Sequence, residues 1–103
     1  MLFRSTAYRH LRFVLGMVGD KDVSSVLKEL PATATYYFCQ PSLPRALPVE
    51  QLELQATQAG LSGKKYPSVA EALQAAIRES EKVDLVFVGG STFVVSEAIG
   101  SLQ

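Results

Sequence analysis

Residues 11–18 (LRFVLGMV) form a nearly continuous apolar run that includes β-branched and aromatic side chains. A run of this kind predicts a strand that is buried on both faces. Strands of that type belong to parallel sheets, whose two faces are covered by helices. The run therefore restricts the chain to a fold in which strands and helices alternate.

The rest of the chain shows this alternation. Four apolar residues at positions i, i+3, i+4 and i+7 predict a helix over residues 20–30, with Asp20 or Asp22 as its cap. Ser68 and Glu71 have the spacing of a capping box, which predicts the start of another helix. The remaining strands are predicted over residues 35–40, 64–66 and 83–88, and the remaining helices over residues 48–59 and from residue 93 onward.

The predicted order β-α-β-α-β-α-β-α implies parallel pairing through right-handed crossovers. We therefore expect an α/β fold with a mostly parallel sheet of about four strands flanked by helices, in a single domain over residues 1–103. Residues 1–10 fit no strand. Phe3, Ala7 and Tyr8 have helical spacing, which predicts that this segment is the end of a preceding helix.

Charge and cysteine content exclude several classes of function. The 103 residues carry ten basic and ten acidic side chains, so no nucleic acid or acidic membrane surface is predicted as a partner. A single cysteine, Cys39, excludes an internal disulfide, and with only one histidine, His10, no metal site is predicted. No apolar run has the length of a signal-peptide core or a membrane span, which predicts a cytoplasmic protein.

Polar residues gather in three loops that follow predicted strands. Ligands of an open parallel sheet bind beyond the carboxyl ends of the strands, where we expect residues 16–22, 40–45 and 89–92. The glycine pair before Ser91 and Thr92 fits a phosphate or carboxylate bound at a helix start. A tight turn in which a hydroxyl only caps the helix fits better, because this pattern is far weaker than a full phosphate-loop motif.

The same loops contain charged candidates for ligand contacts. Lys21 lies between Asp20 and Asp22, which fits either an anionic substrate or transferring phosphate, or a solvated helix start. Arg45 lies in a proline-rich loop that can present its guanidinium to a carboxylate, or it is an ordinary surface arginine. Cys39 has no histidine near it in the sequence and is predicted to be a buried structural thiol.

Four segments, taken in order, resemble one known family. They are GMVGDKD (16–22), PRAL (44–47), YPSVAEA (66–72) and VGGSTFVV (88–95). Together they resemble the C-terminal domain of the bifunctional folylpolyglutamate synthases/dihydrofolate synthases, which belong to the Mur ligase superfamily. Each segment is modest alone, but four in the same order across about residues 11–99 make the resemblance specific.

The resemblance implies a Rossmann-like domain of an ATP-dependent amide ligase. In that family ATP phosphorylates a carboxylate of a folate or pteroate, L-glutamate attacks the acyl phosphate, and Mg²⁺ neutralises the phosphates. The cleft lies between a P-loop ATPase domain and this domain. The motifs imply that Asp20 and Lys21 lie near the phosphates and the glutamate. They also imply that Arg45 is a cation at the cleft edge and that Ser91 faces the glutamate side.

Two motifs of the family are missing from the sequence. It contains no GxxxxGK[ST] phosphate loop. It also lacks the Asp-Gly-Ala-His-Asn type motif, since His10 is followed by Leu11 and Arg12. The resemblance therefore implies that the P-loop domain and the first βα unit of the family domain are missing. We expect this chain alone to have no ligase activity and to bind neither ATP nor Mg²⁺.

A second hypothesis is a stand-alone, non-catalytic binding or dimerisation module that keeps the fold. A missing first strand exposes a sheet edge, which can pair with another copy or a partner. A nucleotide-binding regulatory domain is a third hypothesis, which the absence of a lysine from residues 89–92 disfavours.

Overall fold

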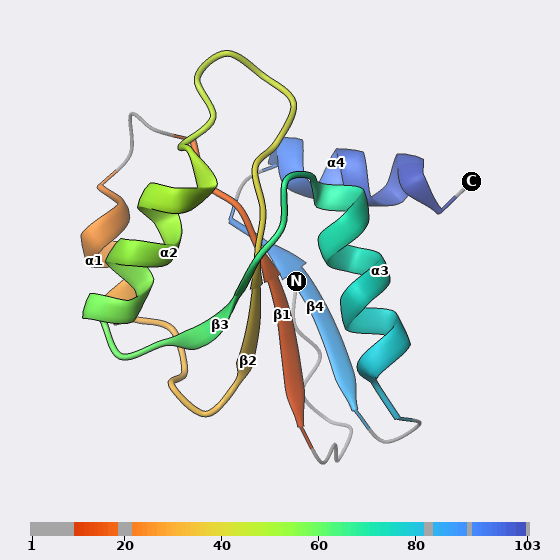
Figure 1. Cartoon of the computed structure of the whole chain (residues 1–103), viewed down its shortest axis with the longest axis horizontal. Coiled ribbons are helices and arrows are strands. Elements are labelled where there is room, and N and C mark those ends of the chain that lie inside the picture. The colour runs from red at the N-terminus through yellow and green to blue at the C-terminus, as the bar shows by residue number, and fades with distance from the viewer. Residues whose placement is uncertain (1–9, 19–21, 82–83, 91, 103) are drawn as a thin grey trace.

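The computed structural model describes residues 10–18, 22–81, 84–90 and 92–102, and eight elements alternate within them in the predicted order (Figure 1). The strands are β1 (Leu11–Leu15), β2 (Thr35–Phe38), β3 (Ser62–Lys65) and β4 (Leu85–Gly89). The helices are α1 (Val23–Lys28), α2 (Val49–Gln58), α3 (Val69–Glu79) and α4 (Thr92–Ser101). Within the described residues, none of the helices has the length and apolar content needed to cross a membrane.

The four strands form one sheet in the order β3-β2-β1-β4. All three strand pairings are parallel. Helices α1 and α2 lie on one face of the sheet, and α3 and α4 lie on the other (Figure 1). The expected α/β fold, with about four parallel strands flanked by helices, is therefore confirmed.

Successive residues of the central strands fill two separate cores. Phe13 of β1 and Tyr36 of β2 pack on the side of α1 and α2. Val14 and Tyr37 pack on the side of α3 and α4. This alternation follows from the period of two in a strand, and it explains why the central strands are apolar on both faces apart from Arg12 and Thr35 near their starts. The prediction that β1 is buried on both faces is confirmed.

The strand predicted over residues 11–18 ends earlier, at Leu15. Met17 and Val18 are nevertheless buried. Val18 forms an isolated antiparallel bridge with Ala46, so the chain has turned away from the sheet at this point. The apolar character of residues 16–18 therefore reflects burial beneath a loop, which periodicity does not distinguish from burial in a strand.

The strand predicted over residues 64–66 is also displaced, because β3 covers Ser62–Lys65. All four of its residues are exposed, so this edge strand has no apolar pattern that marks its ends. The helix predicted over residues 20–30 is shorter, at Val23–Lys28. Val83, the predicted start of the last strand, and residues 1–9 of the helix end predicted over residues 1–10 lie outside the described residues, and His10, the last residue of that segment, is not helical.

The predicted helix caps are confirmed. The Asp22 carboxylate accepts a hydrogen bond from the Ser25 backbone N–H at 3.3 Å, at the start of α1. The Ser68 hydroxyl accepts one from the Glu71 N–H at 3.2 Å, at the start of α3. Gly60, which follows the end of α2, has a φ of 88°, the left-handed conformation that favours glycine after a helix.

Candidate functional site

The loops that follow β1 and β2 meet at the carboxyl edge of the sheet. The Leu47 N–H donates a hydrogen bond to the Met17 carbonyl at 2.9 Å, and Val18 bridges to Ala46. Ala46 follows Arg45 directly, and Val18 precedes Asp20 by two positions. The loop that contains Arg45 is therefore attached to the segment that follows β1.

Only one of the four predicted site residues lies within the described part of the chain. Arg45 is exposed and lies in a turn of the loop after β2, at the expected edge of the sheet. Asp20, Lys21 and Ser91 lie outside the described residues, so their positions in the site stay predictions.

The glycine pair after β4 has a packing role. Gly90 has a φ of 109°, in the left-handed region, and a Cβ atom on it would overlap the carbonyl oxygen of Gly16. The Gly16 N–H in turn donates to the Gly89 carbonyl at 3.4 Å. The loops after β1 and β4 thus touch backbone to backbone, which only glycine permits. This contact explains Gly90 as part of a tight turn, and the phosphate-binding alternative stays untested.

Two side chains that the sequence did not single out hold the loop after β2. The Gln40 Oε1 accepts a hydrogen bond from the Val49 N–H at 2.9 Å, at the first turn of α2. Pro48 is the N-cap residue and its side chain forms no capping hydrogen bond, so the Gln40 side chain takes that role. The Glu97 Oε1 on α4 accepts a hydrogen bond from the Ser42 N–H at 2.7 Å. The only sequence signal for these two contacts is the proline content of the loop, and it does not identify the side chains that hold the loop.

Cys39 is a buried structural thiol, as predicted. It is fully buried, and its Sγ lies 3.5 Å from the Leu15 carbonyl. Burial, together with the nearby Glu97 carboxylate, raises the pKa of the thiol to about 12. Because the thiolate is the reactive form, this cysteine has no nucleophilic role at neutral pH.

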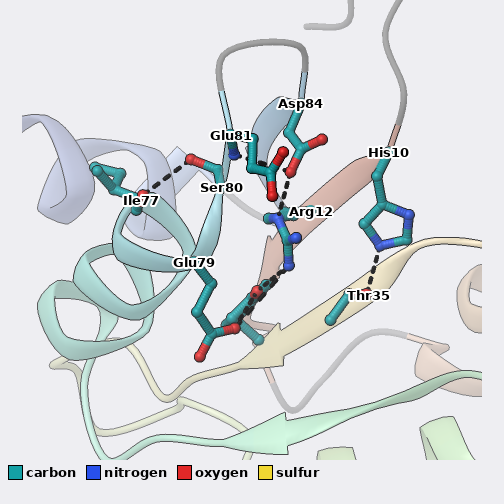
Figure 2. Close-up of polar contacts among 9 residues, drawn as sticks. His10, Arg12, Thr35, Ile77, Glu79, Ser80, Glu81 and Asp84 are labelled. Carbon is teal, nitrogen blue, oxygen red and sulfur yellow. Dashed lines mark hydrogen bonds and ion pairs between the residues drawn. The ribbon is translucent and has the colours of Figure 1, made fainter.

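A network of polar side chains lies at the opposite, amino edge of the sheet (Figure 2). The Arg12 Nε donates to the Asp84 Oδ2 at 3.0 Å, and its Nη1 donates to the Tyr37 hydroxyl at 2.9 Å. That hydroxyl donates to the Glu79 Oε1 at 2.7 Å. The network connects β1, β2, the end of α3 and the residue before β4.

The electrostatics of this network favour its charged form. The hydrogen bond from the Glu81 N–H, together with Arg12, lowers the pKa of the Asp84 carboxyl. Partial burial opposes the charge on Arg12, but its hydrogen bonds to Tyr37 and Asp84 outweigh that effect and raise its pKa. The partners satisfy one another within the protein, so we assign the network a structural role.

A cavity of about 280 Å³ lies beside this network, over β2 and β3. Its polar lining includes Thr35, Tyr37, Ser62, Lys64 and Glu79. These residues come from the first three positions of β2 and β3 and from the last residue of α3. The cavity is lined by residues within the strands, whereas the Arg45 loop lies beyond the end of β2, and parallel sheets bind ligands beyond the carboxyl ends of their strands.

A family model described as "Mur ligase, glutamate ligase domain" matches residues 2–92. The chain belongs to this family. Among the relatives of this Mur ligase domain is the dihydrofolate synthase/folylpolyglutamate synthase of Escherichia coli (strain K12). It is 34% identical over 87 residues, which cover 84% of this chain and 20% of that protein.

Solved structures of relatives share the Mur ligase domain fold. E. coli FolC in complex with DHPP and ADP matches with a TM-score of 0.82 and 29% identity, over 91% of this chain and 22% of that one. A bifunctional folylpolyglutamate synthase/dihydrofolate synthase with Mn, AMPPNP and L-glutamate bound matches with a TM-score of 0.77 and 26% identity, over 90% and 22%. The family resemblance read from the sequence is confirmed, and the chain spans about a fifth of these relatives' length.

Proposed function

We propose that this chain is the C-terminal domain of an ATP-dependent ligase that joins L-glutamate to a folate or pteroate carboxylate. The domain covers residues 1–103, with residues 1–10 as the end of a preceding helix. The attachment of the Arg45 loop to the segment after β1 carries this proposal, because that segment precedes Asp20 and Lys21 in the sequence and lies at the edge where parallel sheets bind ligands. The relatives with ADP, or with AMPPNP and L-glutamate, support the choice of ligands.

The chemistry of the candidate residues fits this role. Arg45 and Lys21 are cations that neutralise the carboxylates of the incoming glutamate. Asp20 orients Lys21. The Ser91 hydroxyl, near the start of α4, adds a hydrogen bond on the glutamate side.

The proposed sites for nucleotide and metal lie on a different domain. Within the described part of the chain, no group of three or more His, Cys, Asp or Glu side chains can hold a metal ion. The sequence also has no phosphate loop. We therefore place ATP and Mg²⁺ on a P-loop ATPase domain outside this chain, with folate and glutamate bound between the two domains. We propose that this chain alone is inactive. We also propose that the complete ligase works in the cytoplasm.

A fusion protein tests the proposed function. In it, this chain replaces the matching segment of the E. coli synthase. We expect the fusion to release ADP and phosphate only when dihydropteroate and L-glutamate are both present. Arg45→Ala should raise the KM for L-glutamate by about tenfold or more, because a charge-assisted hydrogen bond to a carboxylate is lost. Steady-state kinetics measures both effects.

Arg78→Ala is the matched control for Arg45→Ala. Arg78 is an equally exposed arginine in the last turn of α3, toward the opposite edge of the sheet, and its loss should leave the KM unchanged. A folded fusion without glutamate-dependent turnover contradicts the proposed function. If Arg45→Ala and Arg78→Ala change the KM for L-glutamate equally, Arg45 does not belong to the site. Turnover by the isolated chain contradicts its proposed inactivity.

The open edge of β4 favours a second candidate function, a dimerisation module. Among the described residues, β4 pairs with β1 alone, and the run from Leu85 to Val88 is partly exposed and has no charge. The other edge strand, β3, contains Lys64 and Lys65. Lysines protect a sheet edge from further pairing, whereas an apolar edge needs a cover. We propose that β4 pairs with β4 of a second copy when the chain is by itself.

Val86→Pro tests this pairing. The Leu85 N–H bonds to the His10 carbonyl at 2.9 Å, so in a parallel strand the next N–H, that of Val86, points to the open edge. Light scattering should show a concentration-dependent dimer that Val86→Pro converts to monomer while the fold is kept. Lys65→Pro, on the other edge strand, is the control and should stay dimeric. A wild-type chain that is monomeric at all concentrations excludes this module.

A further inference from the structure

Glu97, a half-buried residue of α4, contacts the loop that follows β2. Its carboxylate oxygen Oε1 accepts a hydrogen bond of 2.7 Å from the Ser42 N–H, 55 positions away in the sequence. The short distance and the charged acceptor mark this as one of the stronger kinds of hydrogen bond. The same carboxylate raises the pKa of Cys39, which places its charge near the end of β2 as well.

The loop over residues 41–48 needs anchors from outside itself. Three of its eight residues are prolines, which have no N–H to donate. The bonds from Leu43 N to Pro41 O (2.9 Å) and from Ala46 N to Leu43 O (3.1 Å) hold only the internal turns. They fix the shape of the loop but not its position on the sheet.

Contacts on both sides of Arg45 attach this loop to the rest of the fold. At its far end, Leu47 bonds to Met17, in the segment after β1. At its near end, Ser42 bonds to Glu97, and α4 is the helix that follows the glycine turn after β4. Figure 1 shows this loop and α4 at the same end of the sheet. The Glu97 contact thus links the loop after β2 to the element that follows the third candidate loop.

We propose that Glu97 is a positioning residue that holds the Arg45 loop in place through the Ser42 backbone. It acts on the loop and does not itself contact a ligand. The importance of this anchor for glutamate binding rests on the proposed function, whereas the anchoring of the loop does not. A substituted side chain that accepts the same hydrogen bond should therefore keep the loop in place, whereas a side chain without an acceptor should not.

Backbone NMR on the isolated chain tests the anchor directly. Glu97→Ala should lower the heteronuclear NOE over residues 42–46 and speed hydrogen exchange at Ser42 by about tenfold or more. Glu97→Gln should preserve most of the order, because its amide oxygen still accepts from the Ser42 N–H. Ser96→Ala, at the exposed neighbouring position on α4, is the control. Unchanged loop order in Glu97→Ala, or equal loss in Glu97→Gln, overturns the proposal.

Kinetics of the fusion protein separates positioning from general stability. Glu97→Ala should raise the KM for L-glutamate and leave kcat nearly unchanged, as expected when ground-state binding is lost. In the Arg45→Ala background the same substitution should add little, because both act through one side chain. An undiminished effect in that background overturns the proposal. If Arg45→Ala has no effect while Glu97→Ala loosens the loop, the proposed function fails and the anchor stands.

Discussion

Gly90→Ala is expected to destabilise the fold by about 2–5 kcal/mol, the sum of a left-handed backbone penalty and an overpacked contact. Gly90 has a φ of 109°, and a Cβ atom there would overlap the carbonyl oxygen of Gly16. That oxygen belongs to backbone that is fixed between buried residues, so no side-chain rotation relieves the overlap. Urea denaturation measures the loss of stability.

Two other glycines separate the contact from the backbone conformation. Gly60 also has a positive φ, 88°, but nothing lies within 4 Å of its added Cβ, so Gly60→Ala should cost only about 1–2 kcal/mol. Gly100 is helical and has open space, so Gly100→Ala should stabilise the protein by up to about 1 kcal/mol. If Gly90→Ala lowers the free energy of unfolding no more than Gly60→Ala does, the contact with Gly16 is not the reason that position 90 requires glycine.

The order and type of the elements could be predicted because apolar periodicity reports burial. Phe13, Val14 and Tyr37 fill cores on opposite faces, so their strands are mostly apolar on both faces. The same signal fails where a residue is buried but lies outside a strand, or lies in a strand but is exposed. Met17 and Val18 are buried outside the strand, and the exposed residues of β3 form a strand without an apolar pattern.

The location of the candidate site could be predicted from topology, whereas the groups that build it could not. Parallel strands align their carboxyl ends, so Arg45 was expected at the edge where it lies. The hydrogen bond from Ser42, in the loop that contains Arg45, to Glu97 joins residues 55 positions apart in the sequence. The hydrogen bond from Arg12 to Asp84 joins residues 72 positions apart. No local pattern identifies such pairs, because each depends on how the sheet brings distant segments together.

Arg12→Met is expected to lower the melting temperature by roughly 10 °C. Methionine keeps most of the volume but removes the guanidinium that bonds to Asp84 and to the Tyr37 hydroxyl. The Asp84 side chain is only 2% exposed, so water does not replace the lost partner. Thermal unfolding followed by circular dichroism measures the change.

The double variant Arg12→Met/Asp84→Asn is the control that identifies the cause. It removes the unpaired carboxylate together with its partner, so it should be less destabilised than the sum of the two single variants. Additive effects of the two substitutions mean that the ion pair contributes little and that Arg12 acts by packing alone.

The pH dependence of stability provides an independent test of the Asp84 carboxylate. The Glu81 N–H and Arg12 lower its pKa in the folded state below the ordinary value of 3.8. Its contribution is therefore present at neutral pH and is lost as the pH falls below that value, through the folded pKa. The stability difference between wild type and Asp84→Asn, measured by urea denaturation, should shrink over this acid range. A difference that stays constant from neutral to acid pH excludes a stabilising charge at Asp84 and assigns the effect to the shape of the side chain.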